Sequence, residues 1–88
     1  MSYEIKWKPV PLKFFQKLEK DDRERISKKL DEIEEDPFRC LEHYEGNYYK
    51  LRIGDYRMLV DINFERKIIL LKFLTKEEEF IKGNFLFL

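Results

Sequence analysis

The chain has 88 residues, which is enough for one small domain but excludes two domains of typical size. Lysine and arginine total 18, and aspartate and glutamate also total 18, so the zero formal charge excludes a uniformly basic, nucleic-acid-coating surface. The single cysteine and the single histidine exclude an intramolecular disulfide, a cysteine-based zinc cluster and a multi-histidine metal site.

The sequence contains no apolar segment of the length that a signal peptide or a membrane span requires. We therefore expect a single cytoplasmic domain over residues 1–88, with no cofactor and no contact with a membrane. Hydrophobic residues make up 43% of the chain, which is ample for a packed core and unlike the composition of a disordered chain.

The N-terminal part of the sequence predicts a strand followed by two helices. Residues 3–7 alternate between apolar and polar side chains, which is the pattern of a short strand. Apolar residues then recur at helical spacing, which predicts a helix with Pro11 in its first turn and its end near Lys20. Asp21 and Asp22 are expected to break this helix and to cap the second one.

The second predicted helix ends near Glu35, because Pro37 disfavours helical geometry in the residue before it. The two helices are expected to form an antiparallel hairpin that presents its apolar side to a sheet. Cys40 is expected to be a small buried side chain or an inert surface group. The aromatic residues expected to pack in the core are Trp7, Phe14, Phe15, Phe38 and Tyr49.

From residue 47 onward the apolar pattern changes from helical spacing to alternation. Gly54 and Asp55 form a predicted two-residue hairpin turn, and residues 63–66 form a second turn. The predicted strands cover residues 47–53, 56–62 and 67–74. The fold class is therefore α+β: an N-terminal strand and a helical hairpin packed on one face of a mostly antiparallel four-stranded sheet.

The glutamates at residues 77–79 favour a short C-terminal helix, and apolar residues 85–88 either fold back onto the core or form a partner surface.

The predicted turn at Gly54 and Asp55 fixes the register of the hairpin and sorts its side chains onto two faces. Arg52 then lies directly opposite Arg57, and like charges in this position destabilise a sheet. The face expected to pack against the helices carries Tyr49, Leu51, Ile53, Tyr56, Met58 and Val60. The face expected to point to solvent carries Tyr48, Lys50, Arg52, Arg57, Leu59 and Asp61.

Three cations on one sheet face suggest an anionic ligand, of which a nucleic-acid backbone is the commonest large example. Residues 44–76 contain seven cationic and four acidic side chains, so the part of the chain that builds the sheet is locally positive. Two alternatives stay open at this point. The guanidinium groups can splay apart, or Asp61 and a nearby glutamate can neutralise them.

Metal-free RNA cleavage needs a base for the 2′-hydroxyl, cations for the crowded phosphate and an acid for the leaving oxygen. His43, the only histidine, falls in a predicted loop, where a surface or capping role is expected. Lys50 is the better-placed candidate base, because a lysine beside arginine charges loses its proton more readily. Tyr48 lies on the cationic face, where its ring can stack on a base.

The sequence from residue 49 to 60, YKLRIGDYRMLV, resembles the signature of the RelE/ParE superfamily of toxins from type II toxin–antitoxin systems. This signature is a Lys-Leu-Arg strand, a glycine turn, and a Tyr-Arg pair that opens an apolar strand. The predicted order of strands and helices also fits, so the resemblance covers nearly the whole chain. It implies a RelE-like mRNA interferase that cleaves mRNA in the ribosomal A site without a metal or cofactor. The implied partners are the ribosome, mRNA and a RelB-like antitoxin in a higher-order complex.

The resemblance also implies roles for individual residues. Lys50 matches a base or phosphate contact, Arg57 a cation that stabilises the transition state, and Lys76 the position of a C-terminal arginine. These three form the predicted catalytic set. The predicted RNA-binding set is Tyr48, Arg52 and Phe80.

The C-terminal end of the sequence departs from the family pattern. Lys76 keeps the charge of the family's arginine but not its bidentate geometry. Phe80 stands where the family has a tyrosine, and the glutamates at 77–79 repel RNA. These differences predict weakened or altered cleavage. The alternatives are a degenerate, catalytically silent member and a ParE-like toxin that inhibits a topoisomerase by binding alone.

Overall fold

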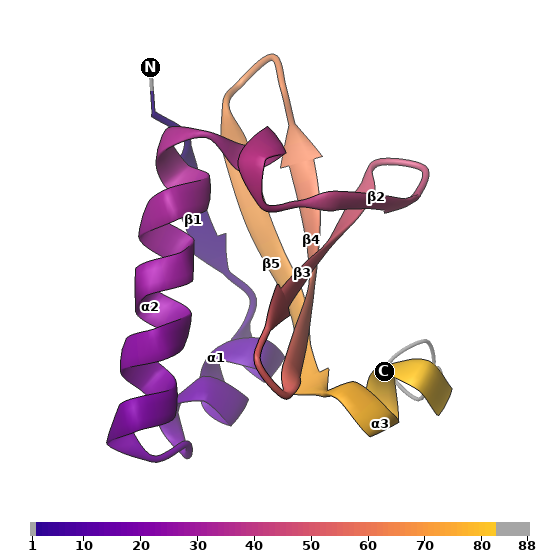
Figure 1. The fold of residues 1–88 in the computed structure, drawn as a ribbon. Coiled ribbons are helices and arrows are strands. Elements are labelled where there is room, and N and C mark those ends of the chain that lie inside the picture. Colours follow the sequence, from indigo (N-terminus) through magenta and orange to yellow (C-terminus); the bar gives the residue numbers. More distant parts are fainter. Residues whose placement is uncertain (1, 83–88) are drawn as a thin grey trace.

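The computed structural model describes residues 2–82 and contains one five-stranded sheet in the order β1-β5-β4-β3-β2 (Figure 1). β1 runs parallel to β5, and the other neighbouring strands are antiparallel. The strands are β1 (Glu4–Trp7), β2 (Glu42–Glu45), β3 (Tyr48–Ile53), β4 (Tyr56–Asn63) and β5 (Ile68–Lys76). The helical elements are α1 (Pro9–Gln16), α2 (Lys20–Glu35), the 3₁₀ turn η1 (Pro37–Arg39) and α3 (Glu77–Lys82). The predicted α+β class is confirmed.

The boundary between the first two helices differs from the prediction. α1 ends at Gln16 rather than near Lys20. Asp21 and Asp22 do not cap α2, because Glu19 takes the extended N-cap conformation and both aspartates lie in the first helical turn. Their carboxylates still favour the helix there, since the N-terminal end of a helix dipole is positive.

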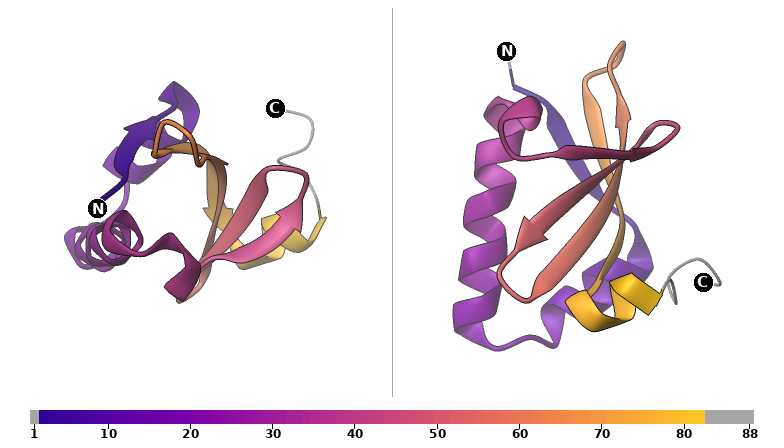
Figure 2. Two further views of the ribbon diagram at one scale, coloured as in Figure 1. Left: turned by 90° about the horizontal axis from the view of Figure 1, so that it is seen from above. Right: turned by 45° about the vertical axis from the view of Figure 1, so that its right-hand side comes forward.

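α2 buries one apolar stripe against the sheet. Ile26 and Ile33 are fully buried and Leu30 is nearly so, because their spacing places them on one side of the helix. They pack with the inner face of the sheet, which contributes Leu51, Ile53, Tyr56, Met58, Val60, Ile62, Ile69, Leu71 and Leu74. Figures 1 and 2 show α2 along this side of the sheet and α3 on the opposite side, at the far end of β5. We call the side that carries α3 the outer face.

The register of the β3–β4 hairpin is the one that the sequence predicts. Arg52 pairs with Arg57, and Lys50 pairs with Leu59. The expected core residues of both strands pack on the inner face, with Tyr49 partly buried against it. The two arginines therefore belong to the outer face.

The prediction of four strands is wrong, because β2 adds a fifth strand at the edge of the sheet beside β3. All four residues of β2 are exposed, so its sequence lacks the apolar alternation that reveals a half-buried strand. His43 consequently lies in a strand and not in a loop. Its Nε2 lies 2.8 Å from the carbonyl oxygen of Gly46, which agrees with the expected surface role.

The expected burial of Phe38 is also wrong. Its side chain is 64% exposed, because it lies in η1, after α2 has left the sheet. The ring stacks on Phe64 with the centroids 5.5 Å apart. The other four aromatic residues expected in the core pack against it while partly buried: Trp7, Phe14, Phe15 and Tyr49.

Two further expectations concern the membrane and the C-terminal end. Among the described residues, no helix has the length and apolar character needed to cross a membrane. The apolar residues 85–88 lie outside the described part of the chain.

Candidate nucleic-acid interface

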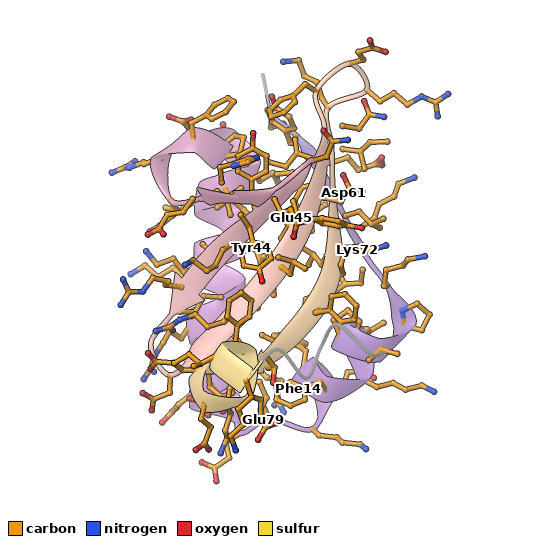
Figure 3. All side chains as sticks on the ribbon, turned by 90° about the vertical axis from the view of Figure 1, so that its right-hand side faces the viewer. Phe14, Tyr44, Glu45, Asp61, Lys72 and Glu79 are labelled. Atoms are coloured by element: carbon orange, nitrogen blue, oxygen red, sulfur yellow. The ribbon has the colours of Figure 1, made fainter. Side chains whose placement is uncertain are left out.

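The cationic residues of the β3–β4 hairpin line a pocket of about 350 Å³ on the outer face. β3 contributes Lys50 and Arg52, and β4 contributes Arg57. The remaining lining residues come from β2 and α3 and are Tyr44, Glu77, Phe80 and Ile81. We call this cavity the outer pocket. Figure 3 looks onto the outer face and shows Tyr44 between β2 and α3.

Arg57 lines the outer pocket, yet only 6% of the residue is exposed. Its Nη1 donates hydrogen bonds of 2.7 Å to the carbonyl oxygens of Gly54 and Tyr56, and its Nη2 lies 3.1 Å from Glu77 Oε1. The expectation that this guanidinium points freely to solvent is wrong, because the first residue of α3 covers it. Two carbonyls and a carboxylate thus hold the charge in a fixed orientation.

The turn that precedes Arg57 is tied to two helices. Gly54 has a φ of +55°, and a Cβ at this position would lie 2.8 Å from Nη1 of Arg25 on α2. Glycine is therefore the residue that both the backbone conformation and the close approach favour. On the other side, the amide of Glu77 donates a 2.7 Å hydrogen bond to the carbonyl oxygen of Asp55. The turn consequently positions the start of α3 as well as the arginine.

Tyr56 gives the turn a second link to α2. Its hydroxyl donates a hydrogen bond of 3.0 Å to Asp22 Oδ2. Burial, and next this hydrogen bond, raise the pKa of Tyr56 above its usual value, since both favour the neutral phenol. The hairpin therefore has a fixed position relative to α2.

The other two cations of the outer pocket differ in their surroundings. Lys50 is half-buried, and its Nζ lies 3.5 Å from Glu42 Oε2 on β2, whereas Arg52 is exposed. The acids that compensate the cations are thus Glu42 and Glu77, so the expectation of a nearby glutamate is confirmed, whereas Asp61 is not among these partners. An incoming phosphate would find Arg52 accessible but would compete with carboxylates for the other two cations.

Two aromatic rings form one wall of the outer pocket. Tyr44 and Phe80 meet edge to face, with ring centroids 5.6 Å apart and an interplanar angle of 64°. Tyr44 stands where β2 shifts register against β3, between His43 and Glu45. Such a bulge redirects a side chain, and here it accompanies an aromatic residue that reaches the pocket. The wall offers apolar surface on which a base can stack.

Two of the six predicted site residues lie outside the outer pocket. Lys76 ends β5 and pairs with Tyr56, which places it toward the inner face. It lines a neighbouring pocket with Asp22, Arg25, Asp55, Tyr56, Glu77 and Glu78. Tyr48 lies further along β3, half-buried and opposite Asp61. The structure therefore brings together Lys50, Arg52, Arg57 and Phe80.

The sequence-based set lacks Tyr44, Glu77 and Ile81 of the outer pocket, and it also lacks Glu42 beside Lys50. Glu77 stands in the acidic run, which signals a helix start but does not reveal the ion pair with Arg57. Glu42 and Tyr44 belong to the strand that the sequence pattern does not show. A usable signal for Tyr44 is an aromatic residue just before a glycine turn in an otherwise polar segment.

Residues 2–82 include side chains of the kinds that bind metal ions, and one thiol, that of Cys40. They contain no group of three or more His, Cys, Asp and Glu side chains that could hold a metal ion. Cys40 is half-buried, and its thiol donates to Glu32 Oε2 at 3.5 Å. Burial, and next this hydrogen bond, raise the pKa of Cys40, which disfavours the reactive thiolate.

Comparisons with known proteins relate this arrangement to toxins. A similar solved structure is the archaeal RelE–RelB complex from Pyrococcus horikoshii, at 26% identity and a TM-score of 0.75, covering 86% of this chain and 96% of that one. A mutant of E. coli RelE in the free state is 25% identical, with a TM-score of 0.76 over 98% of this chain and 96% of that one. The RelBE2 complex of Mycobacterium tuberculosis shares the fold alone, at 15% identity and a TM-score of 0.78, over 88% and 100% of the two chains.

The family comparison covers the elements that build the outer pocket. No curated protein matches the sequence. The model of the family described as the ParE toxin of the type II toxin–antitoxin system parDE matches residues 5–80, which run from β1 into α3 and include the whole β3–β4 hairpin. The chain therefore belongs to this ParE toxin family and, with it, to the RelE/ParE superfamily of toxins.

Proposed function

We propose that this toxin is a ribosome-dependent endoribonuclease that cleaves mRNA in the A site and so inhibits translation. The observation that carries the proposal is the meeting of Lys50, Arg52, Arg57 and Phe80 in one open pocket. Cations beside aromatic rings suit single-stranded RNA, whose phosphates attract positive charge and whose unpaired bases stack. The resemblance of the hairpin sequence to the RelE signature supports the same reading.

In the proposed reaction the 2′-hydroxyl attacks the adjacent phosphate. Lys50 accepts the proton of this hydroxyl, and Arg57 stabilises the charge that develops on the phosphate. The carbonyl contacts of Arg57 support this role, because a guanidinium that is already oriented needs no reorganisation during the reaction. Arg52 binds the backbone at the exposed rim. Lys76 and Tyr48 lie outside the outer pocket and take no part in this step.

The proposed partners are the ribosome with its mRNA and a RelB-like antitoxin. Complexes of RelE with RelB, including those from Pyrococcus horikoshii and Methanococcus jannaschii, are among the similar solved structures. On this toxin, an antitoxin would act by covering the outer pocket or by displacing α3 from it. The toxin–antitoxin complex would be a higher-order assembly in the cytoplasm.

A second candidate function is inhibition of a topoisomerase by binding alone, as in the ParE branch. The matching family model favours this candidate, because it describes ParE. So does the ion pair of Arg57 with Glu77, which compensates the cation that cleavage would require. A degenerate, catalytically silent toxin fits the missing hydroxyl of Phe80 and the position of Lys76.

Primer extension on translated messages after induction tests the proposal. We expect wild-type toxin to produce new 5′ ends within codons, and the variant Lys50→Ala/Arg57→Ala to produce none and to relieve growth arrest. Retained binding of the cognate antitoxin would show that the variant is folded. If the double variant arrests growth as fully as the wild type, the nuclease proposal is wrong. Altered plasmid supercoiling without mRNA cleavage would support the topoisomerase candidate.

A further inference from the structure

Among the described residues that line the outer pocket, Tyr44 is the one that carries a hydroxyl group. The two arginines do not give up protons in proteins, so they act as fixed charges. Glu77 accepts from Arg57 as a carboxylate. Proton exchange with a substrate in this pocket therefore falls to Lys50 and Tyr44.

The local backbone gives Tyr44 its position. β2 shifts register between His43 and Glu45, so Tyr44 stands at a bulge in the pairing of β2 with β3. The residue is 38% exposed, and its ring rests edge to face against Phe80 on α3. The ring is thus held by packing while a large part of the residue stays accessible to a ligand.

We propose that Tyr44 is the general acid of RNA cleavage, an inference that rests on the proposed endoribonuclease function. RNA cleavage through the 2′-hydroxyl needs two proton transfers, and the pocket supplies one group for each. If Lys50 takes the first proton, Tyr44 is the remaining lining residue that can deliver the second. A tyrosine hydroxyl is a proton donor that neither adds charge to the pocket nor repels the phosphate.

The proposed step balances in atoms and electrons. Lys50 first releases a proton to water and then accepts the 2′-hydroxyl proton, and the 2′ oxygen forms a bond to phosphorus. The bond from phosphorus to the 5′ oxygen breaks, and its electron pair stays on that oxygen. Tyr44 donates its proton to the departing 5′ oxygen and regains a proton from water. The products are a 2′,3′-cyclic phosphate and a 5′-hydroxyl end.

The test compares Tyr44→Phe with the wild-type toxin on two mRNAs bound to programmed ribosomes. One mRNA has the natural 5′ oxygen at the cleaved linkage, and the other has sulfur in place of this oxygen. A thiolate leaves without needing a proton, so a proton donor matters for the first mRNA and not for the second. We expect Tyr44→Phe to cleave the oxygen mRNA about 100-fold more slowly and the sulfur mRNA within about threefold of the wild-type rate.

Comparing two substrates on the same variant separates chemistry from folding. The phenylalanine keeps the ring that packs on Phe80, and any loss of folded protein lowers both rates equally. An equal loss on both mRNAs would assign Tyr44 a structural or stacking role and overturn the inference. An unchanged rate on the oxygen mRNA would overturn it as well. Tyr3→Phe is the matched control, because Tyr3 packs its ring under Lys67 Nζ and does not line the outer pocket, and it should cleave both at the wild-type rate.

The same experiment distinguishes the failure of this inference from the failure of the proposed function. If the wild-type toxin cleaves neither mRNA, the endoribonuclease proposal fails and the role of Tyr44 fails with it. If the wild-type toxin cleaves both and Tyr44→Phe shows no selective loss on the oxygen mRNA, only the assignment of Tyr44 is wrong.

Discussion

The two faces of the sheet bury their side chains in different ways. On the inner face, α2 covers a continuous apolar cluster that includes Met58 and Val60, both of which are fully buried. On the outer face, six-residue α3 and the short strand β2 flank a pocket that contains a nearly buried arginine. Arg57 and Met58 are consecutive residues of β4, so this strand contributes side chains to both faces.

The inner face therefore holds most of the apolar core that stabilises the fold, whereas the outer face, where Leu59 is also buried, orients charges. Apolar burial is favourable wherever it occurs, but a buried arginine needs carbonyls and a carboxylate to offset its lost hydration. The outer face supplies these from the turn at Gly54 and from Glu77. Variants on each face should therefore affect different properties.

The largest effect on stability is expected on the inner face. Ile33→Ala removes a fully buried side chain and leaves a cavity, so we expect the free energy of unfolding to fall by about 3–4 kcal/mol. Urea unfolding measures this change. Ile81→Ala is the outer-face control, since Ile81 is 75% exposed and should cost less than about 0.5 kcal/mol. Equal losses would contradict the division between the faces.

The next effect is expected at the turn that joins the two faces. Gly54→Ala places a Cβ at a left-handed φ of +55°, so we expect a loss of about 1–2 kcal/mol in unfolding free energy, mostly from backbone strain, since the exposed end of Arg25 can move aside. Gly46→Ala is the matched control, because its φ is +56° but, beyond its two chain neighbours, no described residue has an atom within 4 Å of the added Cβ. It should lose about 1 kcal/mol from backbone strain alone.

A third variant separates strain from contact in the same turn. Adding Arg25→Ala to Gly54→Ala should recover the difference between the two glycine variants, because it removes the crowding side chain. Urea unfolding of all three proteins measures this. If Gly54→Ala and Gly46→Ala are equally stable, the side chain of Arg25 moves aside without cost and the contact does not affect stability.

A smaller effect is expected from the link between Tyr56 and α2. Tyr56→Phe removes the hydrogen bond to Asp22, so we expect a loss of about 1 kcal/mol at pH 7. Folding raises the pKa of Tyr56, so the unfolded chain releases this proton first as the pH rises. The stabilisation is present below the unfolded pKa of about 10 and is lost as the pH rises through the folded value. Urea unfolding from pH 7 to pH 11 should show the wild type converging on the variant, and parallel curves would contradict this.

The smallest effect is expected on RNA affinity at the outer face. Glu77→Gln removes the carboxylate that compensates Arg57, so a short single-stranded RNA should bind about threefold more tightly. Fluorescence anisotropy measures the affinity, and the gain should shrink at high salt. Glu78→Gln, which lines the neighbouring pocket, removes the same charge and is the matched control. Equal gains from both variants would indicate a general charge effect and not a local one at Arg57.

The hairpin could be predicted from the sequence because its determinants are local. The turn at Gly54 and Asp55 sets the register, and alternation on both sides then assigns each residue to a face. The meeting of Lys50, Arg52 and Arg57 on one face follows from these two facts.

The rest of the pocket could not be predicted because it depends on contacts between distant segments. The exposure of a guanidinium depends on what folds over it, and the contact of Glu77 with Arg57 has no periodic signature. β2 is an edge strand with four exposed residues, so apolar patterning does not mark it. Tyr44 reaches the outer pocket and Phe38 is exposed to solvent because of the way distant segments pack, which local sequence patterns do not reveal.

The parallel pairing of β1 with β5 has a consequence for synthesis of the toxin. Glu4 pairs with Ile68, so β1 cannot join the sheet until β5 has been synthesised. Pairing between segments so far apart forms late, because the ends of a long loop must meet first. A nascent chain that lacks β5 also lacks α3, which follows it directly. The outer pocket therefore forms only after the ribosome has synthesised most of the polypeptide.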